Sequence, residues 1–229
     1  MAQPQSESVA ITLPGGRQSG ATLYLPSGLP APAVLVAHDR WGLTGALRER
    51  AAALAQDRYL VLAVDIFGGR SAATASEADR LAASLDRPSA IDALAGWTDW
   101  IRADARCTRQ IGLLGMGLGG GIAVETAART AVQAVAVYDT PLDRIAVPLT
   151  RLKEPLLGHF SERSREFPVA AVEDIGFRLQ QASKASRLHL YDADPDFANP
   201  ASPHFARAEA LLAWNRTIAF FRAQLGAGA

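Results

Sequence analysis

Short apolar runs alternate with longer amphipathic stretches along the chain, and this alternation limits the folds that it can adopt. Six runs are largely apolar, as strands buried on both faces must be. They span residues 33–37, 60–64, 111–114, 134–137, 155–160 and 188–191. Segments with helical spacing of apolar residues span residues 46–56, 76–85, 90–103, 118–129, 169–182 and 205–224. Helices between buried strands predict right-handed crossovers and a mostly parallel sheet that helices cover on both faces.

An antiparallel hairpin is predicted ahead of these strands. Apolar segments at residues 9–13 and 21–25 are separated by Pro14, Gly15 and Gly16, which favour a turn. We therefore expect an α/β fold with about eight strands, in one domain that spans residues 1–229. Thr74 followed by Glu77 predicts a capping box at the start of one helix.

Charge and composition exclude several classes of partner. Lysine plus arginine and aspartate plus glutamate number 23 each, so no field of one sign attracts nucleic acid or an anionic membrane. No segment approaches the ~18 apolar residues of a membrane span, and residues 1–8 lack the pattern of a signal peptide. We expect a cytoplasmic protein with no nucleic-acid or membrane partner.

The single cysteine, Cys107, excludes an internal disulfide and a cysteine-based metal cluster. It precedes a predicted strand, at the edge opposite to the one where parallel sheets bind ligands. We expect a thiol without a catalytic role. The ligand-binding edge is formed by the loops that begin at His38, Asp65, Gly115, Tyr138, Ser161 and Asp192.

A glycine-rich turn joins a predicted buried strand to a predicted helix. Residues 115–121 read Gly-Met-Gly-Leu-Gly-Gly-Gly, which is the glycine spacing of a nucleophile elbow. The central residue, Gly117, has no side chain that could attack an ester. Gly115, Gly117 and Gly120 also match a dinucleotide-binding pattern, with Asp139 about twenty residues further on. That pattern normally follows the first strand of its domain, whereas several strands precede this turn, so we expect no cofactor.

Four segments together resemble the dienelactone hydrolase family of the α/β-hydrolase superfamily. Residues 34–42 are similar to its strand and oxyanion loop, and residues 65–69 to its Asp-Leu-Tyr-Gly stretch. Residues 111–120 are similar to its Val-Gly-x-x-Gly-x-Cys-x-Gly-Gly motif, and residues 214–221 to its closing helix. The resemblance runs from about residue 9 to about residue 225 and implies an α/β-hydrolase fold.

The family's Cys, Asp and His triad is substituted in this chain. The resemblance places the cysteine at Gly117 and the aspartate at Ser164, four residues before Pro168. It places the histidine at Pro195 or Asp196, in a segment one residue shorter. An arginine that helps to hold the substrate carboxylate in the family is replaced by Asn199. Since triad members act as a unit, these substitutions predict a non-catalytic homologue that binds a small molecule or a protein partner.

A ligand pocket is still expected at the glycine turn. The backbone N–H groups of Arg40 and Leu118 should converge as an oxyanion hole. The expected pocket residues are Asp39, Arg40, Trp41, Gly117, Leu118 and Asp139, with the substituted positions Ser164 and Asp196 beside them.

Two alternatives concern the polar residues at the same edge. In one, the protein is an ester or lactone hydrolase whose catalytic groups are re-sited at His38, Asp39 or His159. In the other, Asp39 forms only a surface ion pair with Arg40 or Arg48. No two histidines have the spacing of metal ligands, so we expect no metal site.

Overall fold

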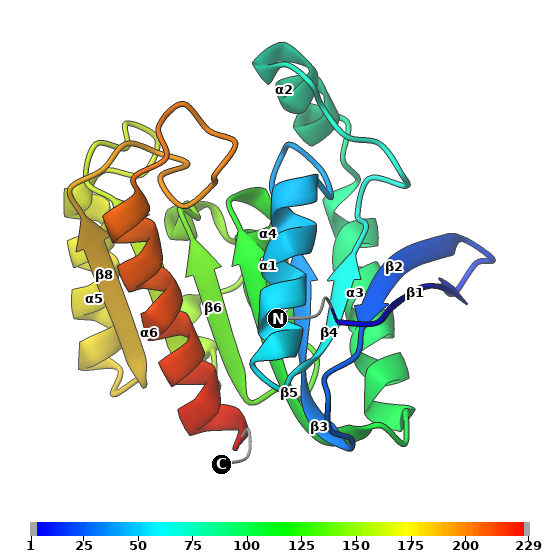
Figure 1. Cartoon of the computed structure of the whole chain (residues 1–229). Coiled ribbons are helices and arrows are strands. Elements are labelled where there is room, and N and C mark those ends of the chain that lie inside the picture. Colours follow the sequence, from blue (N-terminus) through cyan, green and yellow to red (C-terminus); the bar gives the residue numbers. More distant parts are fainter. Residues whose placement is uncertain (1–3, 227–229) are drawn as a thin grey trace.

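The structure is a computed structural model in which residues 4–226 are described (Figure 1). One sheet holds eight strands in the order β1-β2-β4-β3-β5-β6-β7-β8. The strands are β1 (Ser6–Thr12), β2 (Gln18–Tyr24), β3 (Ala31–Ala37), β4 (Leu60–Val64), β5 (Cys107–Met116), β6 (Ala134–Tyr138), β7 (Leu156–Ser161) and β8 (Ser186–Tyr191). β1 pairs antiparallel with β2 and β2 with β4, whereas every other pairing is parallel. The predicted hairpin and the α/β fold are confirmed.

Helices cover both faces of this sheet. They are α1 (Gly45–Gln56), α2 (Ala75–Ala83), α3 (Arg87–Ala103), α4 (Leu118–Ala127), α5 (Val169–Gln181) and α6 (Arg207–Leu225). Apolar residues of α1 and α6 share one buried cluster, and those of α3, α4 and α5 share the other. Figure 1 shows α2 outside these layers, beyond the carboxyl ends of the strands. Two short 3-10 helices, η1 (Leu142–Arg144) and η2 (Leu149–Arg151), lie between β6 and β7.

The central strands are apolar because both of their faces are buried. In β3, Leu35 belongs to the cluster with α3 and α4, while Val34 and Val36 belong to the cluster with α1 and α6. Such strands end where the apolar run ends, which places polar residues at the carboxyl edge of the sheet. The polar residues that could form a functional site therefore lie at this edge.

Several element boundaries differ from the prediction, and the starts of β5 and α3 have a visible cause. β5 begins at Cys107 rather than at residue 111, since Cys107 pairs with Ala31 and is itself buried. The prediction that Cys107 precedes the strand was therefore wrong. The exposed residues 108–110 hid this part of the strand from the apolar pattern. α3 begins at Arg87 because the side chain of Asp86 caps its first turn.

The predicted capping box at α2 is confirmed: Thr74 Oγ1 accepts the N–H of Glu77, whose carboxylate accepts the N–H of Thr74. Within residues 4–226, no helix has the length and hydropathy to cross a membrane. The cytoplasmic location stays a prediction.

Candidate functional site

The elbow between β5 and α4 has a backbone conformation that favours glycine. Gly117 has φ 48° and ψ −114°, in the region of positive φ that side chains disfavour. Its N–H donates to the carbonyl oxygen of Tyr138 at 2.8 Å, and its own carbonyl accepts from the Thr140 hydroxyl at 3.0 Å. The elbow is thus held by the end of β6, although it presents no side chain.

The first turn of α4 lies directly against the end of β3. A Cβ atom on Gly119 would stand 2.4 Å from the carbonyl oxygens of both Ala37 and His38, which only glycine allows. This close packing brings the loop after β3, with Asp39, Arg40 and Trp41, beside the elbow.

Asp39 lies next to the position that a nucleophile would occupy. Its Cβ is 3.5 Å from the point where a Cβ on Gly117 would lie, and its Oδ1 accepts the N–H of Trp41 at 2.8 Å. Partial burial, together with the nearby charge of Asp196, raises the pKa of Asp39 to about 6. The Trp41 N–H and the charges of His38 and Arg40 oppose this shift.

The interpretation of Asp39 as a surface ion pair is wrong. Arg40 instead contacts Asp79 at 2.6 Å, and Arg48 donates to the Thr22 hydroxyl at 2.8 Å. Asp39 is therefore a partly buried carboxyl group whose nearest hydrogen bond comes from the backbone.

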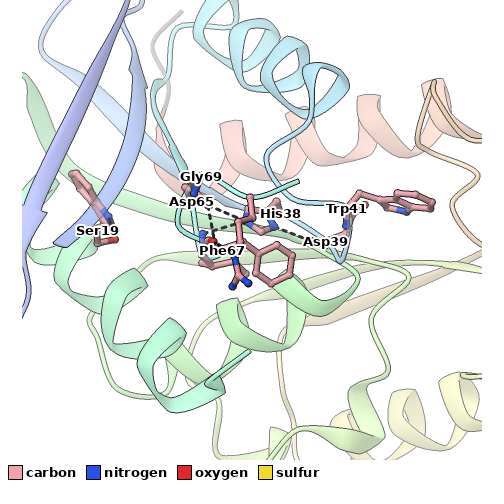
Figure 2. A network of polar contacts seen from close by, with 10 residues as sticks. Ser19, His38, Asp39, Trp41, Asp65, Phe67 and Gly69 are labelled. Atoms are coloured by element: carbon pink, nitrogen blue, oxygen red, sulfur yellow. Dashed lines mark hydrogen bonds and ion pairs between the residues drawn. The ribbon is translucent and has the colours of Figure 1, made fainter. Parts of the chain in front are cut away.

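His38 is fully buried, and its imidazole forms hydrogen bonds with the backbone of two loops. Its Nδ1 is 2.8 Å from the carbonyl oxygen of Asp39, and its Nε2 accepts the N–H of Ile66 at 3.1 Å. Its ring meets that of Phe67 edge-on with centroids 4.7 Å apart. Figure 2 shows the imidazole between the loops after β3 and β4, with Trp41 pointing away from it. Both ring nitrogens face backbone groups, so His38 joins these two loops.

Asp65 completes this network at the end of β4 (Figure 2). It lies 3.7 Å from Nε2 of His38 and accepts the N–H groups of Phe67, at 2.9 Å, and of Gly69. Burial opposes ionisation of Asp65, but the nearby imidazole of His38 and the N–H groups of Phe67 and Gly69 outweigh it and lower its pKa. The turn after β4 is thus held by a carboxylate that faces its own loop.

Asp139 ties together the loops after three neighbouring strands. Its Oδ1 accepts from the N–H of Ser161 at 2.8 Å and from the Ser161 hydroxyl at 2.9 Å. Its Oδ2 accepts the N–H of Asp196 at 3.1 Å. Burial raises the pKa of Asp139 to about 6, with a further contribution from the charge of Asp196, while the bonds from Ser161 and Asp196 lower it.

Ser164 and Asp196 follow β7 and β8, at the two other positions that the sequence singled out. The Ser164 hydroxyl accepts the N–H of Phe167 at 3.1 Å and so closes a local turn. Asp196 has φ 66°, and its carboxylate is close enough to affect the pKa of both Asp39 and Asp139. Three carboxyl groups, Asp39, Asp139 and Asp196, thus come together electrostatically at the carboxyl edge of the sheet.

His159 lies inside β7 and is fully buried. Its Nδ1 is 2.8 Å from the Tyr191 hydroxyl, and its Nε2 is 3.0 Å from the Thr217 hydroxyl of α6. Burial, together with the charges of His189, Arg216 and Arg50, lowers the pKa of His159 to about 3. His159 is therefore a neutral member of a buried polar network, with both nitrogens in use.

Two polar residues of this region were not among the pocket residues expected from the sequence. Ser161 donates to Asp139, and its position as the last residue of an apolar strand was the available signal. Arg50 lies three residues after the buried Leu47 of α1, so helical spacing puts it on an otherwise apolar face.

Within residues 4–226, no group of three or more His, Cys, Asp or Glu side chains is placed to hold a metal ion. A cavity of about 200 Å³ lies between the β6–β7 connection and α5, and a shallow one of about 660 Å³ lies beside α2. Neither is lined by Gly117, Asp39 or Asp139.

Comparison with known proteins decides the family. The model of the dienelactone hydrolase family matches residues 20–225. The chain belongs to this family. It is 25% identical to carboxymethylenebutenolidase from Pseudomonas putida, over 94% of this chain and 95% of that protein. It is 26% identical to carboxymethylenebutenolidase from Pseudomonas sp. strain P51, over 93% of each.

Solved structures show the same fold. A dienelactone hydrolase-like promiscuous phosphotriesterase from metagenomic libraries has a TM-score of 0.86 and 17% identity, covering 98% of this chain and 100% of that one. Dienelactone hydrolase from Anabaena variabilis has a TM-score of 0.73 and 24% identity, with 98% and 100% covered. These likenesses confirm the α/β-hydrolase fold that the sequence predicted.

Proposed function

We propose that this protein hydrolyses a carboxylic ester or lactone, with the Asp39 carboxylate activating water in place of a side-chain nucleophile. The observation that carries the proposal is the position of Asp39, whose Cβ is 3.5 Å from the place of a Cβ on Gly117. Of the three residues considered for re-sited chemistry, His38 and His159 have both nitrogens in hydrogen bonds within the fold. Asp39 is the one that remains available.

Two backbone amides support an acyl-binding role for the elbow. Leu118 is the first residue of α4, so its N–H has no acceptor within the helix. Arg40 directly follows Asp39 in the loop that packs on this turn. Among residues 4–226, neither amide has a hydrogen-bond acceptor. Both are thus free to donate to the carbonyl oxygen of a bound ester, as an oxyanion hole requires.

The reaction follows from these groups. A water molecule attacks the ester carbonyl carbon while the Asp39 carboxylate takes its proton. The carbonyl oxygen becomes an oxyanion, which the N–H groups of Arg40 and Leu118 stabilise. The intermediate collapses by breaking its bond to the leaving oxygen, and Asp39 returns the proton to that oxygen. The products are a carboxylic acid and an alcohol, or one hydroxy acid from a lactone.

The pKa of Asp39 suits a base near neutral pH. With a pKa of about 6, ~90% of the carboxyl is ionised at pH 7, and it is more basic than an ordinary aspartate. The names of the relatives as carboxymethylenebutenolidases are in line with ester or lactone hydrolysis.

Steady-state kinetics with short-chain aryl esters test the proposal. We expect saturable turnover whose kcat/KM rises with pH around 6. Asp39→Asn should lower kcat/KM about 100-fold or more, the usual contribution of a general base. The control is Asp79→Asn, which removes an exposed partner of Arg40 and should leave kcat/KM within about twofold. Equal rates for Asp39→Asn and the wild type would exclude Asp39 as the base.

Binding without turnover is the second candidate, and the missing side chain at Gly117 favours it. If purified protein shows no saturable turnover with any ester of the panel, the protein is a binder that keeps the family fold. A small-molecule ligand would then raise Tm in a concentration-dependent way. Asp39→Asn and Leu118→Trp at the elbow should remove that shift if the ligand occupies the proposed site.

A further inference from the structure

Arg50 occupies a position on α1 where an apolar side chain is expected. The buried residues of α1 are Leu47, Ala51, Leu54 and Ala55, and Arg50 lies one helical turn from Leu47 and from Leu54. This face of α1 packs on the sheet together with α6. An arginine at such a position requires a partner for its charge.

Only one of the two terminal nitrogens of Arg50 has a hydrogen-bond acceptor in the protein. The Nη2 group of Arg50 donates to the carbonyl oxygen of Ala198, in the segment between β8 and α6. Its Nη1 is closed off from solvent and has no hydrogen-bond acceptor. Among residues 4–226, no carboxylate oxygen lies within 4 Å of the guanidinium. The charge is therefore buried without a counter-ion.

Two aromatic rings offset some of the lost hydration. The guanidinium carbon is 5.8 Å from the ring centroid of Tyr138 and 5.3 Å from that of Trp214. Such cation–π contacts are favourable but do not replace a hydrogen bond at Nη1. Burial lowers the pKa of Arg50, and the Tyr138 hydroxyl opposes this shift.

We propose that Arg50 binds the carboxylate group of a small organic acid through Nη1. An anion there provides both the missing acceptor and the missing counter-ion, and a guanidinium fits a carboxylate geometrically. A monovalent anion matches the single charge of Arg50. A phosphate dianion would exceed that single charge.

Arg50 and the elbow both contact Tyr138 but lie on opposite faces of the sheet. Arg50 lies on the face of the sheet that α1 and α6 cover, whereas α4, which starts at the elbow, covers the other face. The proposal therefore does not depend on hydrolase activity. Arg50 as a whole residue is partly exposed, whereas Nη1 is closed off from solvent, so a small acid reaches Nη1 only when the residues around it shift.

Thermal unfolding of the full chain tests the site. Sodium acetate, sodium benzoate, sodium phosphate and sodium chloride are compared at pH 8 and equal ionic strength. We expect acetate or benzoate to raise Tm of the wild type by several degrees more than chloride, and the rise to saturate. Arg50→Gln should lose this extra rise. The control is Arg48→Gln, on the same helix but exposed, which should keep it.

Several outcomes would overturn the proposal. These are no carboxylate effect beyond chloride, an equal effect in Arg50→Gln, or a larger effect of phosphate than of carboxylate. If Arg50→Gln does not fold, Trp214 gives a second measurement, because its ring lies against the guanidinium. Benzoate should then change the wild-type tryptophan fluorescence saturably, and Trp214→Phe should remove that change. A wild type without a saturable change would contradict the site.

Discussion

The Oδ2 atom of Asp139 accepts the backbone N–H of Asp196 at 3.1 Å, which ties the end of β6 to the segment after β8. The other carboxylate oxygen accepts two bonds from Ser161, at the end of β7. One carboxylate thus joins the loop after β6 to the loops after β7 and β8, where the family's aspartate and histidine positions fall. In this chain these loops are joined by a structural hydrogen-bond centre rather than by an imidazole.

Asp139→Ala should destabilise the protein because it leaves the backbone N–H groups of Ser161 and Asp196 without their acceptor. Each such loss costs about 1–3 kcal/mol, offset in part by removal of a partly buried charge. We expect the free energy of unfolding in urea at pH 7 to fall by about 2–3 kcal/mol. Asp143→Ala, at an exposed position of η1, is the control. A change below 0.5 kcal/mol would show that these bonds contribute little.

Stability should fall as pH rises through the range where Asp39 ionises. The pKa of Asp39 in the folded protein is about 6, above its ordinary value of 3.8, so the folded state binds this proton more tightly. Stability is therefore greatest below about pH 4 for this group and decreases up to about pH 7, by about 2 kcal/mol.

The variant Asp39→Asn isolates this effect, since its amide oxygen can still accept the N–H of Trp41. Urea unfolding of both proteins at pH 4.5 and at pH 7.5 gives the difference. The wild type should lose about 2 kcal/mol more than Asp39→Asn between these pH values. Asp79→Asn, at an exposed position, should behave as the wild type. Parallel pH profiles of the wild type and Asp39→Asn would show that Asp39 titrates normally.

The sequence predicted the strands well because buried parallel strands are apolar on both faces, as Val34 and Leu35 illustrate. It also predicted the elbow at Gly117, because the glycines that define this turn all lie within a few residues of one another in the sequence. It could not predict the environment of Asp39, which depends on α4 packing against β3 some eighty residues away in the chain. The same holds for His38, whose Nε2 accepts a bond from Ile66. Burial and partners of polar side chains depend on such distant contacts.

Arg87→Ala should be strongly destabilising because it leaves a buried carboxylate without its cationic partner. Glu125 of α4 is 3% exposed, and Arg87 contacts it at 3.1 Å. The N–H of Ala146 donates to the same carboxylate at 2.9 Å. Breaking a buried pair from one side typically costs about 3–5 kcal/mol.

The double variant Arg87→Ala/Glu125→Gln distinguishes this cause from a loss of packing. The neutral amide can still accept the N–H of Ala146, so the double variant should recover at least about 1 kcal/mol of the loss. Thermal and urea unfolding give these values. If the double variant is less stable than Arg87→Ala, the unpaired charge of Glu125 is not the cause.

Gly117→Ser tests whether the elbow can still hold a side chain. A Cβ at this position meets Asp39 Cβ at 3.5 Å, an ordinary contact, so the cost comes from the positive φ of 48°. Such strain amounts to about 1–3 kcal/mol. Gly119→Ala is the matched contrast, because its Cβ would stand 2.4 Å from two carbonyl oxygens and should destabilise the fold more.

Gly117→Ser also tests whether the chain lacks only the nucleophile or lacks the base that would activate it as well. His38 turns both ring nitrogens to backbone groups, and His159 is held by Tyr191 and Thr217. The hydroxyl introduced by Gly117→Ser therefore has no imidazole to take its proton. We expect a fluorophosphonate probe to label Gly117→Ser no faster than the wild type. Rapid labelling would mean that a general base, Asp39 being the nearest carboxylate, can activate a hydroxyl at the elbow.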